Sequence, residues 1–288
     1  MSNALAGEFV INDHQNGQVI DKEGQGFRGG LVERDLGKHP VGSSSSSRSF
    51  SEEMELIPRE EWPERCAEQK AKKSSLSHIR ETGNNGNRIP SMDQNGQGFC
   101  WAYSTGFAIQ LLRAKAGLPY VELSAHAVGC KMFNHEDRGA WGALSFDFAT
   151  ENGFPSTELW PAKSMSRKYD TKVTWENAKQ HRIVEGWIDL NINHAADADL
   201  TFDQMATCLL NLFPVVTDFY WWGHSVCQES LLDAKPELKQ QGLYDPDRWC
   251  PKGSNSWTDN WGKNGTFVLQ GKKAIPDGGC SPRSVTVG

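Results

Sequence analysis

The sequence has no long apolar run and no concentrated block of charge. No stretch of its 288 residues approaches the roughly 18 consecutive apolar residues that a membrane helix needs. The amino terminus also lacks the basic and apolar regions of a secretory signal. The net charge is −6, and the longest basic cluster is the short segment 70–73. We therefore expect no membrane insertion, no nucleic-acid partner, and a cytoplasmic location in the producing cell.

The sequence also lacks paired cysteines. Its seven cysteines are scattered, and none lies in a CxxC pair with the spacing of a zinc finger. This spacing argues against a structural zinc site. Because we expect a cytoplasmic protein, we predict that the thiols are reduced.

The first 50 residues differ in composition from the rest of the chain. They are rich in Gly, Asn, Asp and Ser, show no helical period, and end in the run Ser43–Ser47. This pattern is typical of a flexible tether. The remainder has enough hydrophobic residues and tryptophans for a core. We therefore predict an extended polar arm over 1–50 with a Ser-rich tether, and one folded domain over 51–288.

Periodicity predicts helices early in this domain and strands late. Residues 52–93 look mostly irregular, and helices are predicted over 100–116, over 141–152, and from Thr201, which forms a capping box with Gln204. Short apolar runs at 213–222, 224–227 and 265–271 predict strands. Without βαβ alternation, this order indicates an α+β protein whose helical half and β-sheet half face each other across a cleft.

Cys100 stands at the start of the first predicted helix in the domain. Unpaired N–H groups and the helix dipole favour a thiolate at that position, and the thiolate is the reactive form of cysteine. A free cysteine is also commonly a small buried hydrophobic residue. The position alone therefore leaves both interpretations open.

The neighbours of Cys100 favour the catalytic interpretation. The segment DQNGQGFCWAYS, residues 93–104, resembles the active-site signature of the papain-like cysteine peptidases, with Gln94 six residues before the cysteine and Trp-Ala-Tyr-Ser after it. The resemblance implies that Cys100 is the nucleophile. It also implies that the Gln94 amide and the Cys100 backbone N–H form an oxyanion hole.

Two downstream segments complete this resemblance. WWGHSVC contains His224 in a context similar to the family's catalytic histidine, and GSNSWTDNWGKNG is similar to the element that contains the family's asparagine. His224 and Asn255 follow Cys100 by 124 and 155 residues, close to the roughly 130 to 150 residues of papain-like enzymes. By resemblance, His224 is the base, Asn255 orients it, and Trp257 shields their hydrogen bond.

The resemblance spans about residues 93–270 and implies a papain-like fold without cofactor or metal. Three features depart from the family. Gln97 occupies the position of a disulfide cysteine, the interval before His224 is short, and the interval from His224 to Asn255 is long. The glycine pair that lines one side of the family's cleft has its nearest equivalent in Gly139 with Trp141 and Gly142. We assign Gly139, Trp141 and Trp257 to substrate binding.

The family's zymogens carry a helical pro-segment, and residues 1–90 show no such pattern. We therefore expect no conventional zymogen, although a non-helical arm could still lie across the active site. The style of the sequence is that of a microbial or bacteriophage-encoded relative.

Three functions remain open. The first is an endopeptidase that acts on polypeptides. The second is a structural or assembly component, for example of a phage virion, whose arm docks on a partner protein or a neighbouring subunit. The third keeps the thioester chemistry in a transglutaminase-like enzyme or a cell-wall amidase. Asn255 within the Asn-Ser-Trp sequence favours the peptidase over the third.

Overall fold

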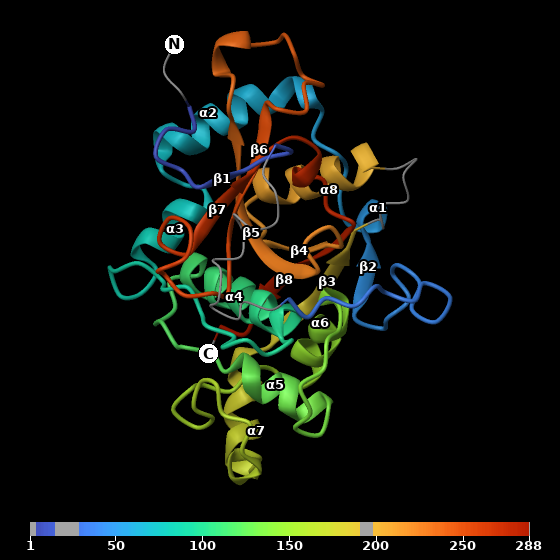
Figure 1. Cartoon of the computed structure of the whole chain (residues 1–288), viewed down its shortest axis with the longest axis vertical. Coiled ribbons are helices and arrows are strands. Elements are labelled where there is room, and N and C mark those ends of the chain that lie inside the picture. Colours follow the sequence, from blue (N-terminus) through green and yellow to red (C-terminus); the bar gives the residue numbers. More distant parts are fainter. Residues whose placement is uncertain (1–3, 15–28, 191–197, 288) are drawn as a thin grey trace.

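The computed structural model describes residues 4–14, 29–190 and 198–287 (Figure 1). Eight strands form one sheet in the order β1-β7-β6-β5-β4-β8-β3-β2. At its two edges, β1 pairs with β7 and β2 pairs with β3 in parallel, and all other neighbouring strands are antiparallel. The strands are β1 Val10–Ile11, β2 Ser47–Ser49, β3 Ile183–Asp189, β4 Val215–Phe219, β5 His224–Asp233, β6 Trp249–Ser254, β7 Thr266–Leu269 and β8 Gly278–Val285.

The helices gather on both sides of a central helix, α4. In Figure 1, α5, α6 and α7 lie below α4, whereas α2, α8 and most of the strands lie above it. The α-helices are α1 Phe50–Glu53, α2 Trp62–Lys72, α3 Leu76–Thr82, α4 Cys100–Lys115, α5 Ala125–Met132, α6 Gly142–Glu151, α7 Lys172–Ala178 and α8 Ala198–Leu210. Short 3-10 helices cover Arg59–Glu61, Arg167–Tyr169, Lys179–His181, Pro236–Leu238 and Gly271–Ala274. Within the described ranges, every helix is too short or too polar to cross a lipid bilayer.

The prediction of an α+β fold with a helical half and a sheet half is confirmed. The predicted helices over 100–116 and 141–152 correspond to α4 and α6, and the three predicted strands correspond to β4, β5 and β7. The capping box is wrong, because α8 begins at Ala198 and Thr201 lies inside its first turn. All seven cysteines are free and buried.

The prediction that 52–93 is mostly irregular is also wrong. Helix α2 buries only Trp62, Cys66 and Gln69, and α3 buries only Leu76 and Arg80. Each of these narrow faces has a polar member, so the two helices offer few apolar residues that could mark a helical period in the sequence. This scarcity of apolar residues explains why the sequence did not reveal the two helices.

The amino-terminal region packs against the rest of the chain. Strands β1 and β2 join the sheet at its two edges. Within the predicted tether, the Ser44 and Ser46 hydroxyls donate to the Asp147 carboxylate on α6. The serine run is therefore folded against the helical half, in place of the free tether that its composition predicts. The boundary at residue 50 stays a prediction.

Candidate active site

Cys100 is the first residue of α4, and its position is fixed by aromatic packing. Phe99 and Trp101 on either side are fully buried, and the Trp101 indole N–H donates to the Gly98 carbonyl at 3.0 Å. The Gly98 N–H in turn donates to the Asp137 carboxylate. These contacts hold the helix start rigidly, so the thiol sits where unpaired helix N–H groups face it.

His224 is the first residue of β5, and the short interval before it is a tight hairpin. Strands β4 and β5 pair from Phe219 opposite His224, and residues 220–223 make the turn between them. Gly223 has a φ of +60°, which glycine adopts without strain. The long interval that follows is also explained, because β5 runs on to Asp233 before β6 returns to Asn255. The altered spacing therefore changes the lengths of the connections around β5, while the pairing of β5 with β4 and β6 is kept.

The structure brings His224 and Asn255 into direct contact. The His224 Nε2 atom lies 2.7 Å from the Asn255 Oδ1 atom, and both side chains are buried. With Oδ1 as the acceptor, Nε2 carries the proton. The proton on Nε2 leaves Nδ1, which has no hydrogen-bond partner among the described residues, as the basic nitrogen.

Tryptophans enclose this pair. The Trp257 ring stacks on the His224 ring at a centroid distance of 4.6 Å and an interplanar angle of 26°. The centroid of the Trp222 ring lies 5.1 Å from that of the His224 ring and 5.7 Å from that of the Trp257 ring. The sequence predicts that Trp257 shields the pair, whereas the contact of Trp222 depends on the hairpin turn and has no local sequence signal. Excluding water strengthens the buried hydrogen bond between His224 and Asn255.

Gln94 is tied to the loop that carries Asn255. The Gln94 backbone N–H donates to the Ser256 carbonyl at 3.0 Å, and the Ser256 hydroxyl donates to the Gln94 side-chain oxygen. This second contact orients the amide, so that its NH₂ group donates to the Gln97 carbonyl at 2.7 Å. The donor end of Gln94 is thus held in the loop that leads into Cys100.

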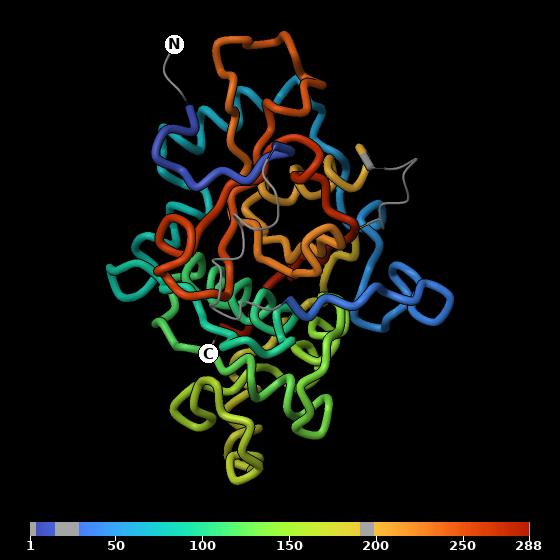
Figure 2. Tube along the Cα trace, in the orientation of Figure 1, coloured from blue at the N-terminus to red at the C-terminus, as the bar shows by residue number. Residues whose placement is uncertain are grey.

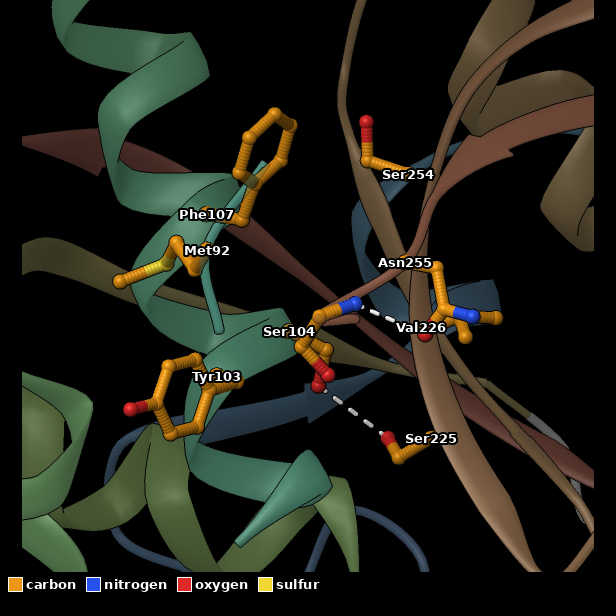
Figure 3. A pocket seen from close by; sticks show the side chains of 9 residues that line it. Met92, Tyr103, Ser104, Phe107, Ser225, Val226, Ser254 and Asn255 are labelled. Atoms are coloured by element: carbon orange, nitrogen blue, oxygen red, sulfur yellow. Dashed lines mark hydrogen bonds between the residues drawn. The ribbon is translucent and has the colours of Figure 1, made fainter. Parts of the chain in front are cut away.

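Behind these residues, the helical half and the sheet half meet in a narrow seam. Figure 3 shows α4 side chains such as Ser104 facing Ser225 on β5, with Asn255 above them. The Ser104 and Ser225 hydroxyls are 3.2 Å apart. The cavity in the seam measures only about 10 Å³, which is room for about one water molecule. A substrate therefore cannot approach from this side.

A segment from the amino-terminal region lies against the Cys100 thiol, to which the Gly30 backbone forms a hydrogen bond. Residues 29–32, in the blue part of the tube in Figure 2, run past the start of α4, where Gly30 lies against Gly98. The Gly30 and Leu31 N–H groups both donate to the Gly223 carbonyl at 3.2 Å. The Val32 N–H donates to the Ala140 carbonyl at 2.9 Å, and the Ala140 N–H donates to the Gly30 carbonyl at 3.0 Å. We call residues 29–32 the covering segment.

Glycines allow the covering segment to approach this closely. A Cβ atom on Gly30 would lie 2.1 Å from the Gly98 carbonyl oxygen, and one on Gly139 would lie 2.4 Å from the Gly30 carbonyl oxygen. Gly139, predicted to bind substrate, therefore lies against the covering segment. Trp141, predicted with it, caps α6 and packs its ring 5.1 Å from the His39 ring.

Burial under this segment governs the protonation of the site. Cys100 and His224 are both 0% exposed. Burial raises the pKa of the Cys100 thiol to about 12, although backbone hydrogen bonds from Ser225, Gly30 and Trp101 oppose the rise. Burial also lowers the pKa of His224 to about 4, against the contribution of its bond to Asn255. In the covered state the pair is therefore a neutral thiol and a neutral imidazole.

Comparisons with known proteins agree with this fold. No family model matches the chain. The plant cysteine protease zingipain-2 from Zingiber officinale is 26% identical over 210 residues, which cover 68% of this chain and 88% of zingipain-2. Zingipain-1 from the same plant is 25% identical over 201 residues, covering 67% of this chain and 86% of zingipain-1.

One solved structure supports the fold. It is that of xylellain, a cysteine protease from Xylella fastidiosa, with a TM-score of 0.53 and 17% identity, covering 68% of this chain and 83% of xylellain. The fold of this chain is thus the papain-like fold that the motifs predicted.

Proposed function

We propose that this relative of the papain-like cysteine peptidases hydrolyses peptide bonds with Cys100 as nucleophile, His224 as base and Asn255 as the group that orients the base. The observation that carries the proposal is the buried 2.7 Å contact between His224 and Asn255, with the Cys100 thiol near the backbone N–H of Ser225, the residue that follows His224. The pairing of a nucleophile with an oriented base is the arrangement that thiol catalysis needs. The relationship to the zingipains supports the same activity.

The chemistry follows from these positions. His224 takes the thiol proton, and the thiolate attacks the carbonyl carbon of the scissile peptide, forming a C–S bond. The Gln94 amide and the Cys100 N–H donate to the oxyanion. The imidazolium then protonates the leaving nitrogen as the C–N bond breaks. Water attacks the thioester and gives one proton to His224, and the C–S bond breaks to release the acid and the thiolate.

The covering segment makes the resting chain latent in this proposal. A polypeptide substrate needs the space beside Gly98, Gly139 and Gly223, which the segment fills. Displacing it admits water, which removes the burial penalty on the charged forms. The pKa of Cys100 then falls and that of His224 rises, both toward the thiolate–imidazolium pair.

The decisive experiment compares Gly30→Ala with Gly30→Ala/Cys100→Ala on a panel of unfolded proteins. The alanine methyl group cannot fit against the Gly98 carbonyl, so the first variant has an open cleft. We expect it to cleave the panel and the double variant to leave it intact, with products identified by mass spectrometry. Equal, negligible cleavage by both, with Cys100 accessible to alkylation, would contradict the proposed function.

The role of Asn255 gives a separate prediction. In the Gly30→Ala chain, we expect Asn255→Ala to lower kcat roughly 10- to 100-fold, because an unoriented imidazole is misplaced for proton transfer, while KM changes little. Steady-state kinetics on one peptide substrate measures both constants. Asn260→Ala is the matched control, since Asn260 is exposed in the same loop. An Asn255→Ala effect equal to that of the control would exclude a positioning role.

A second function, as a structural or assembly component, is favoured by the complete burial of Cys100 and His224 under the chain itself. In that case the arm docks on a partner protein or neighbouring subunit, for example within a virus particle, and the thiol has no substrate. An open-cleft variant whose thiol is reactive but which cleaves nothing would favour this function. Cytoplasmic location in the producing cell stays part of the proposal in either case.

A further inference from the structure

The guanidinium of Arg34, two residues beyond the covering segment, is bound on every side. Its Nη1 and Nη2 atoms donate to the two carboxylate oxygens of Asp189, each at 2.9 Å. Its Nε donates to the His39 carbonyl at 2.7 Å, and Nη2 also donates to the Pro40 carbonyl at 2.7 Å. We call Asp189 and these two carbonyls the guanidinium cup.

The carboxylate of the cup is anchored in the sheet. Asp189 is the last residue of β3, its side chain is 0% exposed, and it also accepts from the Gly42 N–H at 2.9 Å. The loop that supplies the carbonyls continues into β2, whose Ser49 pairs with Asp189. If the covering segment left the cleft, these pairings would hold the cup in place.

A second carboxylate lies near Arg34. Asp218 on β4 is 9% exposed, lies within electrostatic range of Arg34, and has an Oδ1 atom without a hydrogen-bond partner among the described residues. Its other oxygen accepts from the Gly142 N–H at 3.2 Å, where α6 begins. Buried carboxylates are costly unless a cation compensates them. Two buried carboxylates therefore face one guanidinium here, and hydrogen bonds from Ser225 and Gly142 support the second carboxylate.

The cup lies beside the cleft and beside open space. Leu31 pairs with Ala140 through a β-bridge. Arg34 comes three residues after Leu31, so the Cα atoms of Leu31 and Arg34 are at most about 11 Å apart. A cavity of about 270 Å³ adjoins Arg34, between the loop of His39 and the start of α6 at Trp141. A polypeptide in the cleft can thus reach the cup with one long side chain.

We propose that the guanidinium cup is a specificity subsite that binds an arginine side chain of the polypeptide substrate, and that Arg34 fills it in the resting chain. This inference rests on the proposed peptidase function. Arginine fits the cup better than lysine, because only the planar guanidinium can meet both Asp189 oxygens and the two carbonyls at once. An apolar side chain would leave Asp189 buried and unpaired.

Binding tests the subsite without relying on catalysis. In the full chain carrying Cys100→Ala and Arg34→Ala, we expect N-acetyl-arginine amide to bind saturably and at least about tenfold tighter than N-acetyl-citrulline amide, its uncharged isostere. Adding Asp189→Asn should remove the difference. Isothermal titration calorimetry measures both affinities. If Arg34→Ala does not fold, Arg34→Met keeps the apolar stem. Equal affinity for the two amides would overturn the proposal.

Cleavage tests the same subsite in turnover. On the unfolded-protein panel, Gly30→Ala/Arg34→Ala should cut at sites with arginine enriched at one fixed position, and Asp189→Asn in that chain should lose the enrichment while still cutting. Cleavage without an arginine preference contradicts the subsite alone. Arginine-selective binding without any cleavage contradicts the peptidase function and supports the subsite.

Discussion

Replacing Gly30 by alanine is expected to raise the rate at which iodoacetamide alkylates Cys100 at pH 8 by at least about 100-fold. The reason is steric. A Cβ at this position would lie 2.1 Å from the Gly98 carbonyl oxygen and 2.3 Å from its carbon. Both are backbone atoms that cannot rotate away, so the covering segment must leave.

The size of the effect follows from the pKa of the thiol. Under the segment that pKa is raised to about 12 by burial, so at pH 8 only about one thiol in ten thousand is ionised. Exposed to water beside a helix start, a cysteine has a pKa of about 8.5 or lower. Opening the cleft therefore raises the fraction of Cys100 that is thiolate. The increase is largest at pH values between the pKa of the exposed thiol and the pKa of the covered thiol.

Peptide mapping identifies alkylated Cys100 among the seven cysteines. Gly37→Ala is the matched control in the same region, because a Cβ there would meet only the Asp35 side chain, at 3.2 Å. Gly29→Ala should act like Gly30→Ala, since its Cβ would lie 1.9 Å from the Gly223 carbonyl oxygen. If neither variant changes the alkylation rate, the segment does not control access to the site.

The second large effect concerns stability. Arg80→Leu is expected to lower the free energy of unfolding by about 3 to 5 kcal/mol at pH 8, because it leaves the Glu229 carboxylate buried without a compensating charge. The Arg80 and Glu229 side chains are 1% and 0% exposed, with Nη1 and Oε1 3.9 Å apart. Arg80 also donates to the Ile89 carbonyl at 3.1 Å and to the Asn264 carbonyl at 3.2 Å.

The pH dependence identifies the charge as the cause. Burial raises the pKa of Glu229, and Arg80 opposes that rise. Without Arg80, the pKa of Glu229 in the folded state lies further above its pKa in the unfolded state. At pH values above the unfolded-state pKa, the buried carboxylate therefore destabilises the fold. As the pH falls, the group is protonated and the penalty shrinks. Urea unfolding should therefore show a smaller loss at pH 5 than at pH 8.

Two further variants separate this effect from lost packing. Adding Glu229→Gln to Arg80→Leu should recover part of the lost stability at pH 8, since no charge is then buried alone. On α2, Arg65→Leu removes a largely exposed ion pair with Glu61 and should cost less than about 1 kcal/mol. A loss for Arg80→Leu that does not vary with pH would show that the charge on Glu229 is not responsible.

How much of the site could be predicted depended on how local each signal is. Cys100 and Gln94 stand in one short segment, and His224 and Asn255 stand in two others, so residue types alone pointed to them. The sequence could not show how the altered spacing near His224 is accommodated. The hairpin at Gly223 is fixed by the pairing of β4 with β5, and that pairing depends on the whole sheet.

The sequence by itself determined the α+β class, the helix that begins at Cys100, and the residues of the proposed catalytic set. Only the tertiary structure decided that residues 29–32 cover the cleft and that Arg34 meets Asp189, 155 positions away. The physical reason lies in the kind of interaction. The covering segment is held by backbone N–H and carbonyl groups, which every residue carries, and by glycines that contribute only the absence of a side chain. Such contacts leave no periodic pattern, so they become visible only when distant parts of the chain are brought together.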